Sequence, residues 1–552
     1  MKMLVKGAIA MTLAFTGPAH ADVLVDNVNG YTIDENGELD QFVALWIDDD
    51  GKIKQVFDRG EDLPKRTDFR FDGQGQTLLP GLIDSHAHVI EIGLAEMTLD
   101  LSQTESLDQA LGEIEKFARE NPSRPWILGT GWNHEKWGLG RFPTAAELDA
   151  IVADRPIWLE RVDAHAIWAN SVALSRAGIS STTKNPEGGR IERLPGTQTP
   201  SGILVDKAMA LGTGAIPAPR PAELDLALAK AQELLLSYGI TAVADMGTSL
   251  EEWMTFRRAG DLDSLRMRVM VYAQDPDLFE TIGGVGERPW LYNDRLRLTG
   301  VKLFLDGAMG SRGAWLSEPY ADDPGNRGIP AISPTRLRNL ISRAALGNYP
   351  VAAHAIGDAA NAEVISAIEE LSESFPGDRR WRIEHVQILD PADIDRLGKS
   401  EIIASMQPLH QTSDRLMAER RLEPARLDGA YAWRSIIDAG GLIAFGSDAP
   451  VENPDPWAGI AAAISRTDDR GEPAGGWYPA QSVSLVEALQ SFTANAAFAG
   501  FADGRFGRLV PGERADFVLI DRDPFTSSIQ ELRNTRVLQT WLDGTVAWQK
   551  AE

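Results

Sequence analysis

The chain has 552 residues, of which 43% are apolar and 24% are charged. This composition is globular, and the length suffices for one large domain with additions or for several domains. The formal net charge of −26 argues against nucleic acid and anionic lipid as partners, because a strongly acidic surface repels both. The absence of cysteine excludes disulfides, thiolate nucleophiles and thiolate metal sites.

The first 21 residues have the pattern of a secretory signal peptide. Lys2 and Lys6 give a positive start, residues 7–15 form a short apolar run, and residues 19–21 have the small-x-small pattern of a cleavage site. The apolar run is too short to span a bilayer, although a buried first helix or an uncleaved anchor would have a similar composition. We expect cleavage after Ala21, export to the periplasm and no membrane insertion afterwards.

Both ends of the mature chain have the sequence pattern of β-strands. Residues 22–80 and 505–552 contain short runs of valine, leucine, isoleucine and phenylalanine between glycine and aspartate turns, with a hairpin pattern at residues 48–52. Segments from opposite ends of a chain can pair in one sheet. We expect a small composite β-sandwich domain built from both ends.

Residues 81–504 alternate between short apolar strands and helical stretches. Such alternation predicts a parallel sheet, and eight strand–helix units suit a TIM (β/α)8 barrel of the α/β class. Because this barrel usually needs only about 250 residues, we expect insertions, chiefly at residues 123–220. The predicted strands, one or two of which belong to an insertion, are GLIDSHAH, WILGTGW, PIWLERVDAH, ITAVADMG, RLTGVKLFLDG, PVAAHAIGD, RWRIEHVQ, EIIASMQP and LIAFGSDAP.

Polar side chains end many of these strands, where barrel enzymes place their chemistry. His86 and His88 are two residues apart and therefore share one face of a strand with Asp84, as two ligands of one metal must. Asp448 ends the last predicted strand, and imidazole and carboxylate together suit zinc and related metals. One His-x-His pair alone is more often structural. The strand-terminal histidines are His86, His88, His165, His354 and His385.

A lysine lies inside the apolar strand at residues 298–305. An unpaired ammonium is costly to desolvate, so Lys302 either pairs with a partner or is not an ammonium. Asp306 shares its face by the alternation rule, and a simple ion pair with Asp306 is the plainest explanation.

Six motifs of the sequence resemble those of the amidohydrolase superfamily, over nearly the whole mature chain. The lysine context and ERVDAHAIWANSVAL (160–174) are similar to one branch, amidohydrolase family 3, which includes N-substituted formamide deformylases. The six motifs are LLPGLIDSHAH (78–88), VKLFLDGAMGSRGAWL (301–316), AAHAIGD (352–358), IEHVQ (383–387), FGSDAPV (445–451) and GERADFVLID (512–521).

The resemblance implies a binuclear centre of two divalent metal ions, with zinc as the expected metal, in a barrel with a two-ended β-sandwich. By motif position, His86, His88 and Asp448 would bind one ion. His354 and His385 would bind the other, and a carboxylated Lys302 would bridge both. The carboxylation needs a neutral amine, and burial and nearby cations lower the pKa of lysine from its reference value of about 10.4.

The implied reaction is hydrolysis of a small N-acyl or N-formyl amide. A metal lowers the pKa of bound water from about 15.7 toward 7, and Asp448 would act as general base and then protonate the leaving amine. The same barrel can instead act as a deaminase or a lactone or ester hydrolase. A non-catalytic periplasmic binding or regulatory protein is the alternative from another class. A homo-oligomer is compatible with each interpretation.

Five further residues are candidates for substrate contact, each with a structural alternative. His165 is expected to reach the substrate carbonyl and is also a catalytic candidate. The tryptophan and asparagine of GTGWNHEKW would line the pocket or pack within the insertion. The candidates are Trp132, Asn133, His165, Ser311 and Arg312.

Four other residues are not assigned to the reaction. Arg382 and Glu384 alternate away from His385 and are expected to support the structure or the ligands. His134 and His410 are expected to have no role in the site.

Overall fold

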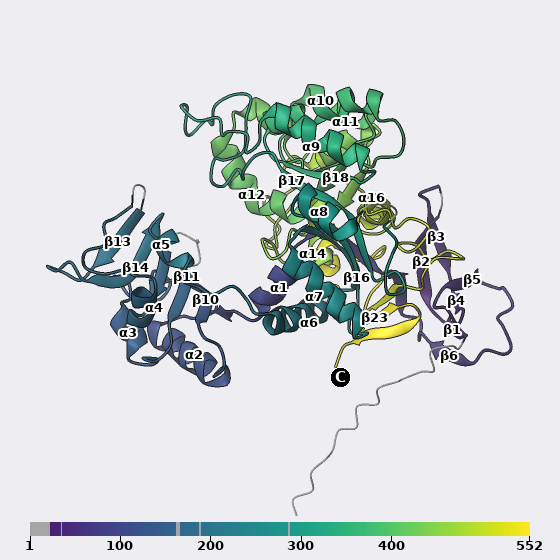
Figure 1. Cartoon of the computed structure of the whole chain (residues 1–552). Helices are drawn as coiled ribbons and strands as arrows, with labels where there is room; N and C mark the ends of the chain where they lie inside the picture. Colours follow the sequence, from purple (N-terminus) through teal and green to yellow (C-terminus); the bar gives the residue numbers. More distant parts are fainter. Residues whose placement is uncertain (1–21, 35, 162–165, 187–188, 285–287, 552) are drawn as a thin grey trace, which may run out of the picture. The chain divides into compact units, whose positions relative to one another are not determined.

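The computed structural model describes residues 22–34, 36–161, 166–186, 189–284 and 288–551 (Figure 1). The predicted signal peptide and His165 therefore lie outside the described residues. The chain forms two compact units, Met1–Val89 with Ala231–Glu552 and Ile90–Lys230, which are described separately. Among the described residues, no helix combines the length and apolar content needed to span a bilayer.

The first unit contains a parallel eight-stranded barrel, in which each strand pairs with the next along the chain. This confirms the predicted α/β barrel. Its last and first strands are joined at their carboxyl ends, where the backbone N–H of Asp448 donates to His86 O at 2.7 Å and that of His88 to Ala449 O at 2.9 Å. The strands are β8 (Leu82–Ala87), β15 (Ile240–Thr248), β16 (Arg268–Ala273), β17 (Leu296–Phe304), β18 (Val351–Ala355), β19 (Arg382–His385), β20 (Ile403–Met406) and β21 (Ile443–Phe445).

Helices alternate with these strands, and several of them begin at side-chain caps. Ser249 and Ser333, for example, each accept a backbone N–H in the first turn of the following helix, which satisfies a donor that the helix itself cannot. The helices are α7 (Leu250–Asp261), α8 (Pro276–Gly283), α9 (Pro334–Leu346), α10 (Asp358–Ser374), α11 (Pro391–Lys399), α12 (Pro408–Arg421), α13 (Trp433–Asp438), α14 (Pro456–Ser465), α15 (Leu485–Ser491), α16 (Ala494–Ala499) and α17 (Ile529–Arg533).

Two sheets outside the barrel belong to the same unit. One has the order β5-β4-β1-β6 and the other the order β24-β23-β22-β7-β2-β3. The second joins the two ends of the chain, because β7 pairs antiparallel with β22. The strands are β1 (Val23–Asp26), β2 (Asn29–Ile33), β3 (Leu39–Phe42), β4 (Ala44–Ile47), β5 (Ile53–Phe57), β6 (Phe69–Asp72), β7 (Thr77–Pro80), β22 (Phe517–Ile520), β23 (Val537–Leu542) and β24 (Thr545–Gln549).

The second unit is built around a six-stranded sheet, and residues 123–220 lie within it. Two of the nine predicted strands, at WILGTGW and PIWLERVDAH, belong to this sheet. Its strands, in sheet order, are β13 (Gly189–Arg193), β14 (Pro200–Asp206), β12 (Ala166–Ala169), β11 (Ile157–Arg161), β10 (Ile127–Trp132) and β9 (Leu99–Asp100). Its helices are α2 (Leu107–Glu120), α3 (Ala145–Asp149), α4 (Ser171–Arg176) and α5 (Ala210–Thr213), while α1 (Val89–Glu96) and α6 (Pro221–Ser237) lie at its two ends in sequence.

One barrel strand, β16, was not predicted. Its residues are all buried, but it opens on an arginine and ends in no strand-terminal histidine or aspartate.

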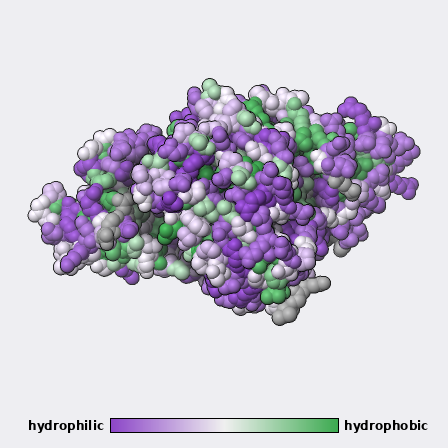
Figure 2. Space-filling model, turned by 90° about the horizontal axis from the view of Figure 1, so that it is seen from above, coloured by the Kyte–Doolittle hydropathy of each residue, from purple (hydrophilic) through white to green (hydrophobic). Residues whose placement is uncertain are grey.

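The face seen in Figure 2 is mostly hydrophilic, with hydrophobic side chains in small patches, as is normal for a protein surface.

Arg268 connects the barrel to the sheet of the chain ends. It is fully buried, and its guanidinium group donates to Asp516 at 2.5 and 2.7 Å and to Asp543 at 2.6 Å. The arginine belongs to β16, whereas both aspartates belong to the C-terminal segment that forms the sheet. Both carboxylates are therefore compensated by a charge from the barrel.

We expect Arg268→Met to lower the free energy of unfolding by about 3–5 kcal/mol, because removing one partner leaves a buried charge uncompensated. Urea denaturation followed by circular dichroism measures the change. The control is Lys399→Met, whose ammonium belongs to an exposed pair with Asp395 and contributes little. An unchanged urea midpoint for the Arg268 variant would contradict this prediction.

Candidate metal centre and active site

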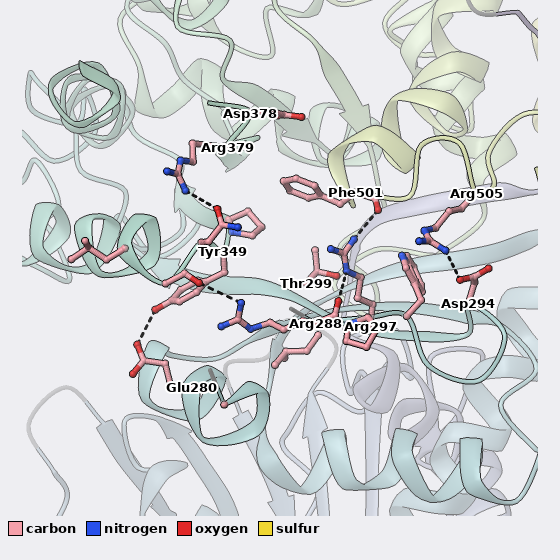
Figure 3. A pocket seen from close by; sticks show the side chains of 18 residues that line it. Glu280, Arg288, Asp294, Arg297, Thr299, Tyr349, Asp378, Arg379, Phe501 and Arg505 are labelled. Carbon is pink, nitrogen blue, oxygen red and sulfur yellow. Dashed lines mark hydrogen bonds and ion pairs between the residues drawn. The ribbon is translucent and has the colours of Figure 1, made fainter. Parts of the chain in front are cut away.

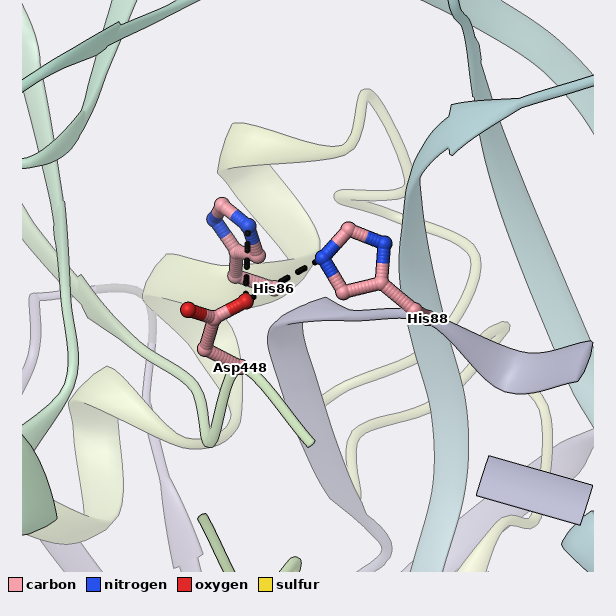
Figure 4. Close-up of side chains that lie close together, drawn as sticks. All are labelled: His86, His88 and Asp448. Atoms are coloured by element: carbon pink, nitrogen blue, oxygen red, sulfur yellow. Dashed lines mark hydrogen bonds and ion pairs between the residues drawn. The ribbon is translucent and has the colours of Figure 1, made fainter. Parts of the chain in front are cut away.

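Six side chains come together at the carboxyl ends of five barrel strands. Asp448 lies at the middle of one half of this cluster, where its Oδ1 is 3.2 Å from Nε2 of His88 and 3.4 Å from Nε2 of His86 (Figure 4). The six are His86 at the end of β8 and His88 just beyond it, Lys302 in β17, His354 in β18, His385 in β19 and Asp448 beyond β21.

The remaining members extend the cluster from His86. Nζ of Lys302 is 3.2 Å from Nε2 of His86. The ring of His385 lies 4.8 Å from that of His86 and 4.5 Å from that of His354, between centroids. The structure therefore places the predicted ligands in one continuous group.

Three imidazoles of the cluster, those of His86, His354 and His385, have pKa values below the usual range and are neutral at pH 7. Burial opposes protonation of His88, but its pKa is instead raised by its hydrogen bond with Asp448 and by nearby carboxylates. Burial, together with the nearby Lys302 ammonium, lowers the pKa of His86 to about 4 and that of His354 to about 3. Burial also lowers the pKa of Lys302 to about 8. Although burial opposes its ionisation, Asp448 has a pKa well below the usual range because His86 and His88 stabilise the carboxylate. The cluster thus offers lone pairs and a negative charge, as a cation site requires.

Two acceptors orient the histidine rings. Nδ1 of His86 is 2.6 Å from a carboxylate oxygen of Glu384, and Nδ1 of His385 is 2.9 Å from Oε1 of Gln407. A carboxylate can only accept, so the proton of His86 lies on Nδ1 and its Nε2 lone pair points toward Asp448 and Lys302. Such outer hydrogen bonds accompany metal-bound histidines in general.

The strand alternation fails at the end of β19. Glu384 and His385 are adjacent in sequence, yet both face the cluster. The backbone explains this, because His385 and Val386 have φ angles of +77° and +46°. This left-handed conformation turns the second side chain back to the side of the first.

Two nearby aspartates accept their hydrogen bonds chiefly from backbone N–H groups, although Oδ1 of Asp306 also lies 3.5 Å from Nε2 of His354. Asp84, on the face predicted for ligands, accepts from the backbone N–H groups of His86 and Ser447 at 3.0 Å each. Asp306 accepts from the backbone N–H groups of three residues at 2.8–3.0 Å. The simple Lys302–Asp306 ion pair is therefore not the arrangement found. The three donors to Asp306 are Trp315, Ile356 and Gly357.

Gly446 permits the close approach of β21 to β8. A Cβ at this position would lie 2.5 Å from the backbone nitrogen of His86 and 2.6 Å from Oδ1 of Asp84. Any larger residue would push the last strand away from the first. The glycine of the FGSDAP motif is thus explained by barrel closure, which also sets the position of Asp448.

The donor set fits a divalent metal. The ligand atoms of His86, His88 and Asp448 all lie within 4.8 Å of one another. Nε2 of His354 is buried and makes no hydrogen bond, with Oδ1 of Asp306 3.5 Å away, so this nitrogen is unsatisfied unless something else binds it. Imidazole nitrogens and a carboxylate are suitable ligands for zinc and related ions.

His410, for which no role was predicted, belongs to this cluster. It lies in the first turn of α12, its ring stacks on that of His385 at 5.9 Å, and its Nε2 is 3.7 Å from Oδ2 of Asp448. The ligand atoms of these three residues also lie within 4.8 Å of one another. Its place directly after the predicted strand EIIASMQP was the available indication, because loops after barrel strands carry functional groups.

The predicted substrate residues are placed as follows. Trp132 is fully buried in the core of the second unit, with its indole N–H donating to Leu159 O at 2.9 Å. Asn133 accepts from the backbone of the turn that follows it. Ser311 donates to Ala308 O, and Arg312 is paired with Asp322 at 2.8 Å. Those last two residues lie in the loop after the lysine strand.

Comparison with known proteins identifies the group to which this barrel belongs. The sequence profile of the amidohydrolase family matches residues 71–547, which include the whole barrel and strands β7, β22 and β23 of the joining sheet. The chain belongs to the amidohydrolase family. This amidohydrolase is therefore a hydrolase whose family membership supports binding of a divalent metal.

Two relatives and one solved structure show how far the likeness extends. The amidohydrolase is 34% identical to Protein LONG AFTER FAR-RED 3 of Arabidopsis thaliana, over 85% of this chain and 82% of that one. It is 28% identical to the N-substituted formamide deformylase of Arthrobacter pascens, over 96% and 98%. A metal-dependent hydrolase of unassigned function from Pyrococcus horikoshii OT3 shares the fold with a TM-score of 0.75 and 26% identity, over 92% and 99%.

Proposed function

We propose that this amidohydrolase cleaves the carbon–nitrogen bond of a small N-acyl or N-formyl amide. The observation that carries the proposal is the continuous series of contacts from Lys302 through His86 and Asp448 to His88. The formamide deformylase relative, which matches almost the whole chain, supports the amide as substrate class.

The proposed centre holds two divalent ions, with zinc as the expected metal. His86, His88 and Asp448 would hold one ion, His354 and His385 the other, and a carboxylated Lys302 would bridge them. When bound, such ions supply Lewis acidity and make water a nucleophile at neutral pH. The carbamate forms when the neutral amine of Lys302 makes a bond to the carbon of CO₂ and releases one proton to water. Burial disfavours the ammonium, and two bound cations would stabilise the anionic carbamate in its place.

The chain's own groups then have distinct tasks. Asp448 takes a proton from the attacking water and returns it to the leaving amine, because its carboxylate lies at the centre of the cluster. Glu384 and Gln407 hold the histidine rings in place. Phe304, which is 47% exposed with its ring 5.6 Å from that of His354, offers an apolar wall to the acyl or amine group.

A substrate panel tests the proposed reaction. Zinc-supplemented mature protein is incubated with N-formyl, N-acetyl and longer N-acyl amines and amino acids, and free amine is measured, with chelated enzyme as control. We expect chelator-sensitive amine release from at least one member. Release of ammonia from amino-substituted rings alone would assign a deaminase, and cleavage of lactones or esters alone would assign that class. Bound metal without turnover on any substrate would indicate a non-catalytic protein.

We expect Gln407→Leu to weaken metal binding by about 10–100-fold, the usual effect of losing an outer hydrogen bond to a metal-binding histidine. The leucine fills a similar volume, so the fold should persist. Competition with a chromogenic zinc chelator measures the affinity, and Gln103→Leu, at an exposed position of the second unit, is the control. Equal affinity in both variants would show that Gln407 does not support a metal ligand.

We also propose that the protein is exported to the periplasm after cleavage behind Ala21. The support is the charged start, apolar run and small-residue site of the first 21 residues. N-terminal sequencing of protein from the periplasmic fraction of a bacterial host should begin at Asp22. Full-length protein confined to the cytoplasmic fraction would contradict export.

A further inference from the structure

A cavity of about 1200 Å³ lies at the end of the barrel opposite the metal centre (Figure 3). It is formed by the amino ends of β17 and β18, the turn before β19, the end of α8 and the segment after α16. The carboxyl ends of the same strands carry Lys302, His354 and His385. Barrel catalysis takes place at the carboxyl ends, so this cavity has no part in the proposed reaction.

The cavity carries a local excess of positive charge. Arg288, Arg297 and Arg379 line it, and in the described part of the chain none of their hydrogen bonds goes to a carboxylate. Arg288 donates to Gly347 O, Arg297 to Phe501 O and Arg288 O, and Arg379 to Phe375 O, Ala345 O and Asn348 Oδ1. Three guanidinium groups thus face one space without a bound anion from the protein.

The acidic residues of the lining form their ion pairs with other arginines, and Arg288 has in addition an electrostatic interaction with Glu280. Glu280 is bound by Arg343 at 2.7 Å, Asp294 by Arg505 at 2.8 Å and Asp378 by Arg380 at 2.9 Å. Each carboxylate is thereby neutralised by an arginine other than the three named above. In a chain of net charge −26, such a positive cavity is a local exception that attracts anions.

Polar atoms in the lining also lack partners. Nε of Arg288, Nε1 of Trp290 and Oγ1 of Thr299 are buried and have no hydrogen-bond partner, and Thr299 is only 4% exposed. All three can donate a hydrogen bond. Leaving a buried donor unsatisfied is unfavourable, so three of them around one cavity favour an occupant rich in acceptor oxygens.

Aromatic side chains complete the lining. Trp290 and Phe501 lie with their ring centroids 5.9 and 5.8 Å from the guanidinium carbon of Arg297, and Tyr349 lies 5.5 Å from that of Arg288. Flat ligands stack on such rings and on guanidinium planes. The lining thus pairs flat faces with cationic groups.

We propose that this cavity binds a small organic anion in which a carboxylate or phosphate is attached to a flat, apolar ring. Arg288, Arg297 and Arg379 bind the anionic group through charge-assisted hydrogen bonds. Trp290, Tyr349 and Phe501 contact the ring. Binding here is separate from amide hydrolysis, which takes place at the other end of the strands.

Isothermal titration calorimetry of the metal-loaded full chain tests the site, with benzoate and phenyl phosphate as probes. Benzyl alcohol supplies the ring without the charge, and inorganic phosphate supplies the charge without the ring. We expect at least one ring-bearing anion to bind about tenfold or more tighter than either control compound. Equal binding of benzyl alcohol, or of inorganic phosphate, would overturn the proposal, as would no binding of either probe at millimolar concentration.

Variants locate the binding. Arg379→Gln and Thr299→Val should each weaken it several-fold, while Arg396→Gln, on α11 outside the lining, should leave it unchanged. The two cavity variants change separate positions, so if one of them fails to fold, the other still tests the proposal. Asp448→Asn and metal removal should not affect binding. Probe binding that is lost in Asp448→Asn, or that persists unchanged in both cavity variants, would place the anion elsewhere and overturn the proposal.

Discussion

Replacing Asp448 with asparagine is expected to lower the turnover of amide hydrolysis by about 10²–10⁴-fold, the usual contribution of a general acid–base group. Asparagine has nearly the same shape but can neither take the proton of the attacking water nor supply the negative charge between His86 and His88. Steady-state amine release by the purified variant measures the effect.

The fold should survive this change. Asp448 has a φ of +60°, which asparagine tolerates better than most residues, and the bond that closes the barrel here is donated by its backbone. Asp395→Asn, on the exposed surface of α11, is the matched control. Full turnover in Asp448→Asn, with circular dichroism showing both variants folded, would rule out this carboxylate as the base.

Removing the side chain of Lys302 is expected to remove the ligand that is proposed to bridge the two ions. Lys302→Ala should lose at least one equivalent of bound metal and most of its hydrolytic activity. The physical reason is that two divalent cations in a buried cluster need an anionic ligand between them, and alanine offers none. Plasma mass spectrometry of the dialysed protein gives the metal content.

Small carboxylates provide the internal control for this variant. Formate or acetate can occupy the space left by the lysine and should restore part of the metal content and activity to Lys302→Ala, without effect on the wild-type chain. Lys399→Ala, at an exposed position of α11, should behave as wild type. Unchanged metal content in Lys302→Ala would refute the bridging role.

Much of the barrel was predictable because strand and helix periods differ. Seven of its strands were visible as short apolar runs, and the residues that end them carry the polar groups of the cluster. The pairing of the chain ends was also predicted, since β-type segments flank an alternating core. The continuous group from His88 to His385 follows from the barrel and from the polar residues that end its strands, because the carboxyl ends of parallel strands meet at one end of a barrel.

Other features needed the three-dimensional structure. The strand β16 was not predicted and opens on Arg268, whose burial is explained by its contacts to Asp516 and Asp543. The positive φ of His385 could not be read from alternation. His410 reaches Asp448 from a helix rather than from a strand, so the rule that found the other histidines did not apply to it.

Two aspartates show that spacing along a strand does not predict the partners of a side chain. Asp84 and Asp306 have the spacing of ligands or ion-pair partners, yet both accept hydrogen bonds from the backbone of neighbouring segments. Spacing alone indicates the face of a strand on which a carboxylate lies. Which donors surround it depends on loops that come from distant parts of the chain.

Metal removal and titration test the central claim most directly. The protein is stripped with a chelator, zinc is returned in known equivalents, and bound metal and amine release from the best substrate of the panel are recorded together. The account predicts that activity disappears on stripping and returns with bound zinc, reaching its full value at about two equivalents per chain. Full amine release by protein shown to contain no metal would contradict it.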